Sequence, residues 1–353
     1  MTSPQHVLDD TVASIRPLDD EAMEAARARQ ATLTKPPGSL GVLEELSVRL
    51  AGVAGACPPP YPDELAVVVF AADHGVVAQG VTPWPQEVTA AMIENFRAGG
   101  AAVNVLAGEA GGRVVAVDIG TVGEVKEDAT VWSRKVRAGT ADLSLGPAMT
   151  RAEALTALGT GIRVAEELID EGYDALATGD MGIGNTTASA CLISHLTGRP
   201  AAEVTGRGTG IDDAMLAHKT GLVERAVSRI APDADPVDAL AEVGGLEHAG
   251  LAGLILAGAA RRVPVVLDGV IAGAAALVAA SLAPVAIDYC VAGHRSVEPG
   301  HAATLTHLGL RPLVDLDLRL GEGSGAALAF PLLRASAAVL RDMATFGEAG
   351  IDA

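Results

Sequence analysis

The feature that most constrains the fold is a pattern that occurs four times along the chain. Continuous apolar runs at residues 66–72, 114–117, 175–177 and 263–267 each lead into a turn that contains Asp or Gly, and stretches of helical character lie between them. An unbroken apolar run is typical of a strand that is covered on both faces, as in a parallel sheet. The repeated order of strand, polar turn and helix therefore predicts an α/β fold: a three-layer, Rossmann-like, mostly parallel sheet with helices on both faces.

The same pattern predicts where a ligand binds and how the chain is divided. In open parallel sheets the ligand site lies beyond the carboxyl ends of the strands, which is where the turns with Asp and Gly fall. We expect residues 61–330 to form the sheet domain, and residues 1–60 with 331–353 to form a smaller helical subdomain. The uncharged stretch 269–287 is long enough to span a membrane, but its many Ala and Gly residues and Pro284 predict a buried helix with a flanking turn.

Charge and cysteine content exclude several classes of protein. The 353 residues include 25 Lys and Arg against 44 Asp and Glu, which gives a net charge of −19. This charge repels phosphate backbones and anionic lipids, so we expect neither a nucleic-acid nor a membrane partner. Cys57, Cys191 and Cys290 are far apart and form no CxxC pair, which argues against a disulfide framework or a cysteine zinc site. Because the chain starts without a basic and apolar leader, we expect it in the cytoplasm.

Two glycine-rich turns are candidates for binding an anion. In GDMGIGNTT (179–187), Gly182 and Gly184 let backbone N–H groups approach a ligand at the start of a helix, whose dipole attracts phosphate. An ordinary tight turn between strand and helix explains the same residues equally well, and the motif is neither a Walker A loop nor GxGxxG. The second candidate is GRGTG (206–210) followed by Lys219, for which a solvated surface turn is the alternative.

A glutamate between glycines is the candidate catalytic group. Glu322 lies between Gly321 and Gly323, after an alternating, strand-like run at 313–318. The small neighbours leave its side chain open to a ligand, and in a dry pocket its pKa would rise toward that of a useful base. The alternative is that the charge of Glu322 caps the helix that follows.

Other arrangements point less clearly to chemistry. The DHG turn at 73–75 suggests a metal or catalytic pair, but no ligand spacing such as HExxH accompanies it, so we expect a hydrogen-bonded turn and no metal. Met92 recurs with Val88 and Phe96 at helical spacing, which predicts a core-facing stripe. Trp84, just before this stripe, is suited to line a flat apolar pocket. The chain contains no GxSxG elbow and no SxxK motif, which argues against serine hydrolases of those types.

Several motifs that occur in this order resemble one enzyme family. They are TKPPGSLG (34–41), AADHGV (71–76), GDMGIGNTT (179–187), HRSVEPGH (294–301) and RLGEGSGAALA (319–329). From about residue 10 to about residue 345 the chain resembles the nicotinate-nucleotide–dimethylbenzimidazole phosphoribosyltransferase family. The resemblance implies transfer of ribose 5-phosphate from nicotinate mononucleotide to 5,6-dimethylbenzimidazole, which gives α-ribazole 5′-phosphate and nicotinate for the lower loop of cobalamin. It also implies no metal or organic cofactor, and a homodimer in which the partner subunit completes each active site.

The resemblance also implies roles for individual residues. Glu322 matches the general base that takes a proton from the benzimidazole, and Asp180 matches a carboxylate that stabilises positive charge on the ribose. Asp268 corresponds to a position close to the ribose or nicotinate. The implied phosphate contacts are Gly182, Gly184, Gly208, Lys219 and Ser296, and the implied base pocket includes Trp84, Met92 and Leu320.

Two departures from the family pattern affect these expectations. Asp180 stands where many relatives have Glu, so its reach is shorter by one methylene. Trp84 and Met92 stand where some relatives have small polar residues, so the base pocket should be more apolar and accept other flat azoles or a purine. Two other classes stay open: a non-catalytic binder of a nucleotide or corrinoid precursor, and a nicotinamide-dependent oxidoreductase, which the missing GxGxxG disfavours.

Overall fold

Six parallel strands form the centre of the molecule. The computed structural model describes residues 3–351, which contain one sheet with the strand order β3-β2-β1-β4-β5-β6. All five neighbouring pairs are parallel, which confirms the predicted α/β class. The chain winds outward from β1 in one direction and from β4 in the other, so the strand order reverses between these two strands. The strands are β1 (Leu65–Ala72), β2 (Arg113–Gly120), β3 (Val131–Ser133), β4 (Ala175–Met181), β5 (Val265–Leu267) and β6 (Cys290–Ala292).

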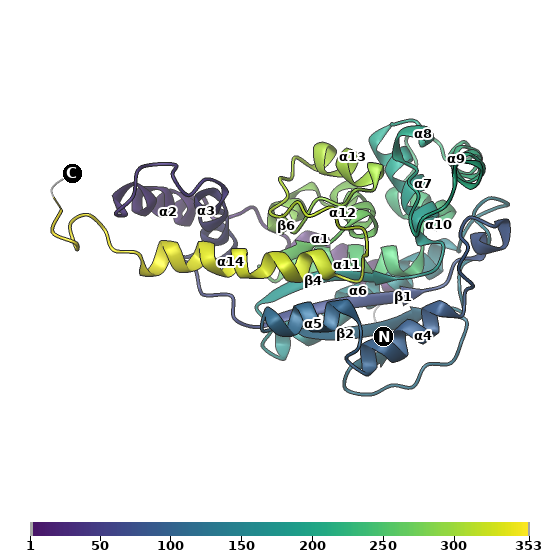
Figure 1. The fold of residues 1–353 in the computed structure, drawn as a ribbon, viewed down its shortest axis with the longest axis horizontal. Helices are drawn as coiled ribbons and strands as arrows, with labels where there is room; N and C mark the ends of the chain where they lie inside the picture. Colours follow the sequence, from purple (N-terminus) through teal and green to yellow (C-terminus); the bar gives the residue numbers. More distant parts are fainter. Residues whose placement is uncertain (1–2, 352–353) are drawn as a thin grey trace.

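Helices cover both faces of the sheet (Figure 1). Alternate residues of β1, such as Val68 and Phe70, belong to a core shared with one set of helices. Their neighbours Val67 and Val69 belong to a second core on the opposite face. The first face is covered mainly by α1 (Pro4–Ser14), α6 (Arg151–Asp170), α11 (Leu246–Ala260) and α12 (Val270–Leu282), and the second by α4 (Val88–Arg97), α5 (Ala102–Glu109) and α14 (Ser324–Asp342).

The remaining helices connect the strands or extend the molecule. Some of the helices that follow β4 pack against α12, and the others pack against those helices. These connecting elements are η1 (Gly75–Gln79), α7 (Asn185–Thr197), α8 (Ala201–Val204), α9 (Asp213–Val227), α10 (Pro236–Val243), η2 (Pro284–Tyr289) and α13 (Pro299–Leu308).

A small helical cluster lies at one end of the molecule (Figure 1). It consists of α2 (Asp20–Thr32), α3 (Val42–Ala54) and the end of α14, which bury Ala26, Ala51 and Leu340 between them. In contrast, α1 packs against α6 and α11, and α14 continues unbroken through Pro331. The predicted division of the chain, into a sheet domain of 61–330 and a subdomain of 1–60 with 331–353, stays a prediction. The outermost residues of that subdomain lie outside the described part of the chain.

The strand predictions are confirmed at four places and need correction at others. All four continuous apolar runs form strands, namely β1, β2, β4 and β5. The short strands β3 and β6 were not predicted. The strand-like interpretation of 313–318 is wrong, because this segment is not one of the six strands of the sheet. It lies beside the end of β6, where the Leu313 N–H donates to the Ala292 carbonyl and Val314 forms an isolated bridge to His294. Asp315 and Asp317 alternate with apolar residues there, but both are exposed on a loop.

Two helical predictions have different outcomes. The uncharged stretch 269–287 forms the buried helix α12 and the turn η2, as expected. No helix in the described chain is both long enough and apolar enough to cross a bilayer. The stripe that includes Met92 is only partly right, because the buried face of α4 is formed by Thr89, Ile93 and Phe96, and Met92 is half-buried.

Candidate active site

A pocket of about 110 Å³ opens at the carboxyl ends of β4 and β5. It lies next to the point where the strand order reverses, which is where ligands bind in open parallel sheets. Of the turns predicted to converge, those after β4 and β5 contribute to the lining, whereas Asp118 remains inside β2. The lining residues are Asp180, Met181, Gly182, Ile183, Asn185, Thr186, Gly208, Thr209, Gly269, Val270, Ile271, His294, Ser296, Glu298, Arg319, Leu320, Gly321 and Glu322.

The loop before α14 turns the Glu322 side chain into this pocket. Glu322 has a positive φ of 66°, and its neighbours Gly321 and Gly323 have φ values of 84° and 94°. Such a left-handed run favours glycine, and a Cβ on Gly323 would lie 2.5 Å from Val67 Cγ1. The loop also needs Gly179, whose Cβ would lie 2.5 Å from the carbonyl oxygen of Glu322. The glycines that frame Glu322 are therefore required by the close approach of the loop to the sheet.

The environment of Glu322 suits a proton acceptor better than a helix cap. Its side chain is buried in the pocket wall, and Oε2 has no hydrogen-bond partner among residues 3–351. Burial, together with the negative charge of Asp268, raises the pKa of Glu322 to about 7. A group with this pKa accepts protons efficiently near neutral pH.

Asp268 caps α14 and so holds the Glu322 loop in place. Its carboxylate accepts backbone N–H bonds from Gly323 at 3.1 Å, Gly325 at 2.8 Å and Ala326 at 3.1 Å. His294 Nε2 lies 3.4 Å from Oδ1. Although burial opposes the charge, these partners lower the pKa of Asp268, so it is an anion. Asp268 is fully buried and is not among the lining residues of the pocket.

Asp180 lies at the end of β4, beside the Glu322 loop. The position of a Cβ on Gly321 would be 3.4 Å from both carboxyl oxygens of Asp180. Asn185 Nδ2 donates to Asp180 Oδ2 at 3.0 Å, whereas Oδ1 has no hydrogen-bond partner in the described chain. Burial and the charges of Asp268 and Glu247 raise the pKa of Asp180 well above its usual value.

The predicted phosphate-binding residues divide into two groups. Gly182, Gly208 and Ser296 line the pocket directly. Gly184 is instead the N-cap of α7, with a φ of 91°. Lys219 lies one layer deeper: it is buried, and its Nζ donates to Thr186 Oγ1 at 2.7 Å and to the Gly206 carbonyl at 3.2 Å. Burial lowers the pKa of Lys219 to about 8, against the opposing charge of Glu298.

The predicted base-pocket residues are also only partly together. Leu320 lines the pocket and is exposed at its mouth. Trp84 is 49% exposed and Met92 is half-buried, and neither lines this pocket. The apolar lining near Leu320 instead includes Met181 and Ile183.

The sequence analysis did not single out several of the lining residues, among them Arg319, Glu298 and Met181. Arg319 directly precedes the Leu320–Glu322 segment, so its place in the motif was a usable signal. Glu298 accepts the Gly208 N–H at 2.9 Å and faces Gly206, where a Cβ would overlap its carboxylate. Met181 follows Asp180 at the end of β4, but nothing in its sequence position signalled exposure to the pocket.

A buried His–Glu–His group lies beneath the pocket. Glu247 Oε1 is 2.7 Å from His74 Nε2 and 2.8 Å from His248 Nδ1, and all three side chains are fully buried. His248 Nε2 lies 2.8 Å from Ser189 Oγ. The residue types and their spacing match what a metal ion needs. His74 is hydrogen-bonded to Oε1, whereas His248 Nδ1 lies close to the same oxygen without hydrogen-bond geometry. The group is therefore explained as a cluster of buried polar contacts around one carboxylate.

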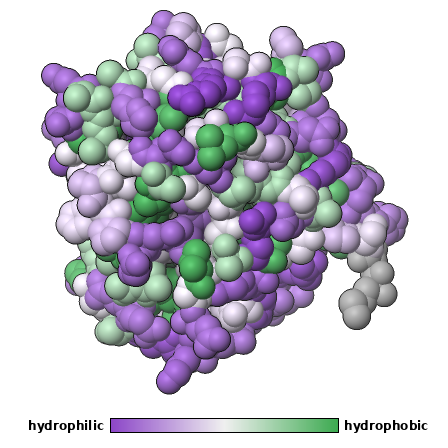
Figure 2. Space-filling view, turned by 90° about the vertical axis from the view of Figure 1, so that its right-hand side faces the viewer, coloured by the Kyte–Doolittle hydropathy of each residue, from purple (hydrophilic) through white to green (hydrophobic). Residues whose placement is uncertain are grey.

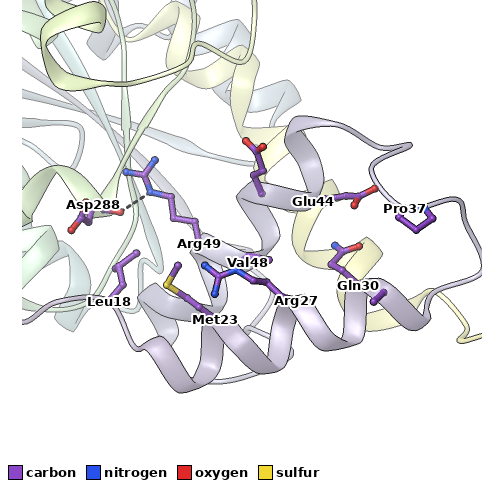
Figure 3. Close-up of a pocket in the computed structure, with 11 residues that line it drawn as sticks. Leu18, Met23, Arg27, Gln30, Pro37, Glu44, Val48, Arg49 and Asp288 are labelled. Carbon is purple, nitrogen blue, oxygen red and sulfur yellow. Dashed lines mark hydrogen bonds between the residues drawn. The ribbon is translucent and has the colours of Figure 1, made fainter.

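A larger cavity, of about 560 Å³, lies away from this site between α2, α3 and η2. Figure 3 shows Met23, Arg27 and Arg49 around it, with Arg49 directed toward Asp288. Arg49 donates to the backbone carbonyl of Asp288 at 2.7 Å, which ties α3 to the sheet domain. The cavity contains neither a glycine turn nor an unpartnered carboxyl group like Glu322, so its size does not make it the active site.

Comparison with known proteins decides the family. A sequence profile described as Phosphoribosyltransferase matches residues 15–351. The chain belongs to this phosphoribosyltransferase family. A relative from Chloroflexus aggregans is 57% identical over 98% of both chains, and one from Salinispora tropica is 56% identical over 98% of this chain and 99% of the relative. Both are named nicotinate-nucleotide–dimethylbenzimidazole phosphoribosyltransferase.

Comparison with a solved structure shows that the fold of this chain also matches that of the family. The nicotinate-nucleotide–dimethylbenzimidazole phosphoribosyltransferase from Thermus thermophilus matches with a TM-score of 0.91 and 50% identity, covering 95% of this chain and 100% of that chain. The family and the class of reaction that the motifs implied are thus confirmed, and the chain is an enzyme that transfers a phosphoribosyl group.

Proposed function

We propose that this enzyme transfers the phosphoribosyl group of nicotinate mononucleotide to 5,6-dimethylbenzimidazole, and so makes α-ribazole 5′-phosphate for the lower loop of cobalamin. The relatives are named for these two substrates. One observation connects the proposal to particular residues. Glu322 is a buried carboxyl group with an unpartnered oxygen in the described chain and a raised pKa, and the pocket that it lines also includes the glycine turns at Gly182 and Gly208.

Glu322 would act as the general base. One benzimidazole nitrogen attacks the anomeric carbon of the ribose while Glu322 takes the proton from the other ring nitrogen. The bond to the pyridinium breaks, and its electron pair returns to the ring, so nicotinate leaves without needing an acid. A single displacement of this kind inverts the anomeric carbon from β to α. A positioned base typically contributes ~10²–10⁴-fold to the rate.

The phosphate would bind at the opposite end of the pocket. The backbone at Gly182 and Gly208, the Ser296 hydroxyl and the N-terminus of α7 offer hydrogen-bond donors there. Gly184 would act by starting α7, and Lys219 by placing positive charge behind Thr186. Local positive potential is needed because the whole chain carries a charge of −19.

The aromatic acceptor would lie against the apolar lining. Leu320 and Met181 support this placement by their position next to Glu322 and Asp180. Trp84 precedes α4 and Met92 lies on it, and α4 packs against β1. These two side chains are proposed to complete the apolar wall once a flat ring is bound. Asp268 is proposed to act indirectly, by holding the Glu322 loop that faces the substrates.

Release of nicotinate tests the proposed reaction. The purified chain is mixed with nicotinate mononucleotide and 5,6-dimethylbenzimidazole, and nicotinate and the new nucleotide are separated by chromatography. We expect equal amounts of both products. Binding of the nucleotide without release would instead identify a non-catalytic binder. Parallel reactions with unsubstituted benzimidazole and with adenine measure how far the apolar pocket accepts other flat bases.

We also propose a homodimer that resides in the cytoplasm. Val297, Leu316 and Leu320 are exposed near the pocket and could be covered by a second copy. The three cysteines are free thiols, as a reducing compartment requires. Sedimentation equilibrium would give twice the chain mass for the dimer and the chain mass for a monomer. Fractionation of cells that express the chain tests the compartment.

A further inference from the structure

The phosphate turn, residues 182–184, joins β4 to α7, and the backbone N–H groups from this turn onward alternate in their hydrogen bonding. The N–H groups of Ile183, Asn185 and Thr187 donate to acceptors of the protein. In the described chain, no backbone carbonyl accepts those of Gly184 and Thr186. Backbone N–H groups without a carbonyl partner at the start of a helix are what an anion needs. The turn therefore suits phosphate only while its backbone keeps this alternation.

The phosphate turn lies so close to the sheet that it needs glycine on both sides of Ile183. A Cβ on Gly182 would lie 2.5 Å from the carbonyl oxygen of Ala72, the last residue of β1. A Cβ on Gly184 would lie 2.9 Å from Val77 Cγ2 in η1, and the φ of Gly184 is 91°. Glycine restricts its backbone less than any other residue. The conformation of Ile183 must therefore be fixed by a contact from elsewhere in the fold.

A buried hydroxyl on α4 makes that contact. Thr89 Oγ1 accepts the N–H of Ile183 at 3.2 Å, and the two residues are 94 positions apart in the chain. Both are buried, Thr89 completely. Because the peptide group between Gly182 and Ile183 is planar, this bond also directs the Gly182 carbonyl. That carbonyl accepts the N–H of Asn185 at 3.1 Å, so one peptide plane connects Thr89 to the start of α7.

The hydroxyl of Thr89 is used differently from those of other buried threonines in helices. Thr11, Thr160 and Thr304 each donate to the carbonyl four residues earlier in the same helix. Such a bond is local, and a helix offers it at almost any position. The Thr89 hydroxyl instead accepts a bond from a loop of the active site, which packing of α4 alone does not require.

We propose that Thr89 is a positioning residue, which holds the phosphate turn in the conformation that binds the phosphate of the nucleotide. This inference rests on the proposed function. Thr89 does not line the pocket, whereas Ile183 does, so Thr89 acts through the turn and not by contact with the substrate. A turn that is ordered before binding loses less conformational freedom when the ligand arrives, and this increases affinity.

Two substitutions separate the hydroxyl of Thr89 from its packing. Thr89→Val keeps the shape of the side chain but has no acceptor, whereas Thr89→Ser keeps the acceptor and loses a methyl group. We expect the KM for nicotinate mononucleotide to rise about threefold to tenfold in Thr89→Val, which corresponds to one neutral hydrogen bond. The kcat and the KM for dimethylbenzimidazole should stay within about twofold, and Thr89→Ser should behave like the parent.

A matched control and three outcomes make this test decisive. Thr160→Val replaces a buried threonine on α6, which contributes no residue to the pocket, and should change neither KM. A nucleotide KM like that of the parent in Thr89→Val would overturn the proposal. An equal rise in Thr89→Ser would do the same, because it would assign the effect to the methyl group. So would an equal rise in both KM values, which would indicate a displaced α4.

Hydrogen–deuterium exchange tests the bond itself without any need for activity. The amide of Ile183 should exchange slowly in the parent and in Thr89→Ser, and about tenfold faster or more in Thr89→Val. Equal exchange in the parent and Thr89→Val would overturn the proposal.

Calorimetric titration with nicotinate mononucleotide separates this proposal from the proposed function. Thr89→Val should bind the nucleotide about threefold to tenfold more weakly than the parent does. A parent that binds the nucleotide but releases no nicotinate would refute the proposed reaction alone. Equal binding constants in the parent and Thr89→Val would refute the role of Thr89 alone, so the two failures are distinguishable.

Discussion

The chemistry proposed here depends on one side chain held in an unusual backbone conformation. Glu322 has a positive φ between two left-handed glycines, and it is buried without a partner for Oε2 in the described chain. A non-glycine residue in this region costs about 1–3 kcal/mol, and such residues cluster at functional sites. The strain and the raised pKa therefore coincide at the same residue.

Replacement of Glu322 tests its role directly. Glu322→Gln keeps the size of the side chain but removes its basicity, so turnover should fall by ~10²-fold or more while the nucleotide still binds. Steady-state kinetics and calorimetric binding measure the two effects. A turnover within a few-fold of the parent would exclude Glu322 as the base.

The pKa of Glu322 predicts the acidic side of the pH–rate profile. The base must be ionised to accept a proton, and its pKa is raised to about 7 by burial and by Asp268. Activity should therefore be present above pH 7 and decline about tenfold per unit below it. The profile of kcat/KM between pH 5 and 9 measures this. In Glu322→Gln the residual activity should lack this decline, and an unchanged decline would assign it to another group.

At the scale of elements, the N-terminus of α14 connects stability to catalysis. Asp268 lies after β5, yet it accepts three N–H bonds from the first turn of α14 and so joins the sheet to the helix that positions Glu322. The helix N-terminus has a positive end that favours this anion.

Asp268→Asn should weaken both properties. An amide oxygen accepts fewer and weaker bonds, so the free energy of unfolding should fall by about 2–4 kcal/mol, and turnover should fall with it because the Glu322 loop loosens. Urea denaturation and nicotinate release measure the two effects. Asp233→Asn, at an exposed loop position, is the matched control and should change neither. A stable but inactive Asp268→Asn would point to a direct role at the substrate instead.

The contact between α6 and α11 depends on glycines. A Cβ on Gly161 would lie 1.9 Å from the carbonyl oxygen of Gly250, and one on Gly253 would lie 2.1 Å from that of Leu158. Gly161→Ala should thus force the helices apart and lower the free energy of unfolding by about 3 kcal/mol or more. Gly221→Ala, inside α9 with nothing within 4 Å, should instead stabilise by about 0.5–1 kcal/mol. Denaturation curves of both variants test the contrast.

The sequence predicted those elements whose signal is local. Continuous apolar runs identified β1, β2, β4 and β5, because strands buried on both faces need them. The three-residue strands β3 and β6 are too short to carry a pattern, and the alternation at 313–318 arises on an exposed loop.

For the site, local sequence and the resemblance identified Glu322 and Gly182 as candidates. The depth of Lys219 and the capping of α14 by Asp268 could not be read in this way, since both depend on contacts between distant segments.

At the scale of the whole molecule, charge opposes the binding of an anionic substrate. The net charge is −19, and Figure 2 shows hydrophilic residues over much of one face, with hydrophobic ones in small, separated patches. Positive potential at the pocket must come from a few groups, such as Arg319 at the pocket and Lys219 behind it.

This imbalance predicts an unusual dependence on salt. Screening by ions reduces long-range repulsion, so raising the salt concentration from about 0.01 M to 0.15 M should lower the KM for nicotinate mononucleotide by a few-fold. The KM for the uncharged benzimidazole provides the control and should stay nearly constant. A rise in the nucleotide KM would mean that local attraction by Arg319 and Lys219 exceeds the repulsion of the molecule as a whole.

The order of the pocket residues along the chain has a consequence for biosynthesis. The glycine turns at Gly182 and Gly208 are translated well before Glu322, and α14, whose first turn holds that loop, is translated after all three. A polypeptide whose synthesis stops early contains the anion-binding turns without the base or its support. On the proposed roles, the capacity for reaction is thus gained only after the Glu322 loop and α14 have been synthesised, and copies that end before residue 322 should be unable to consume the nucleotide.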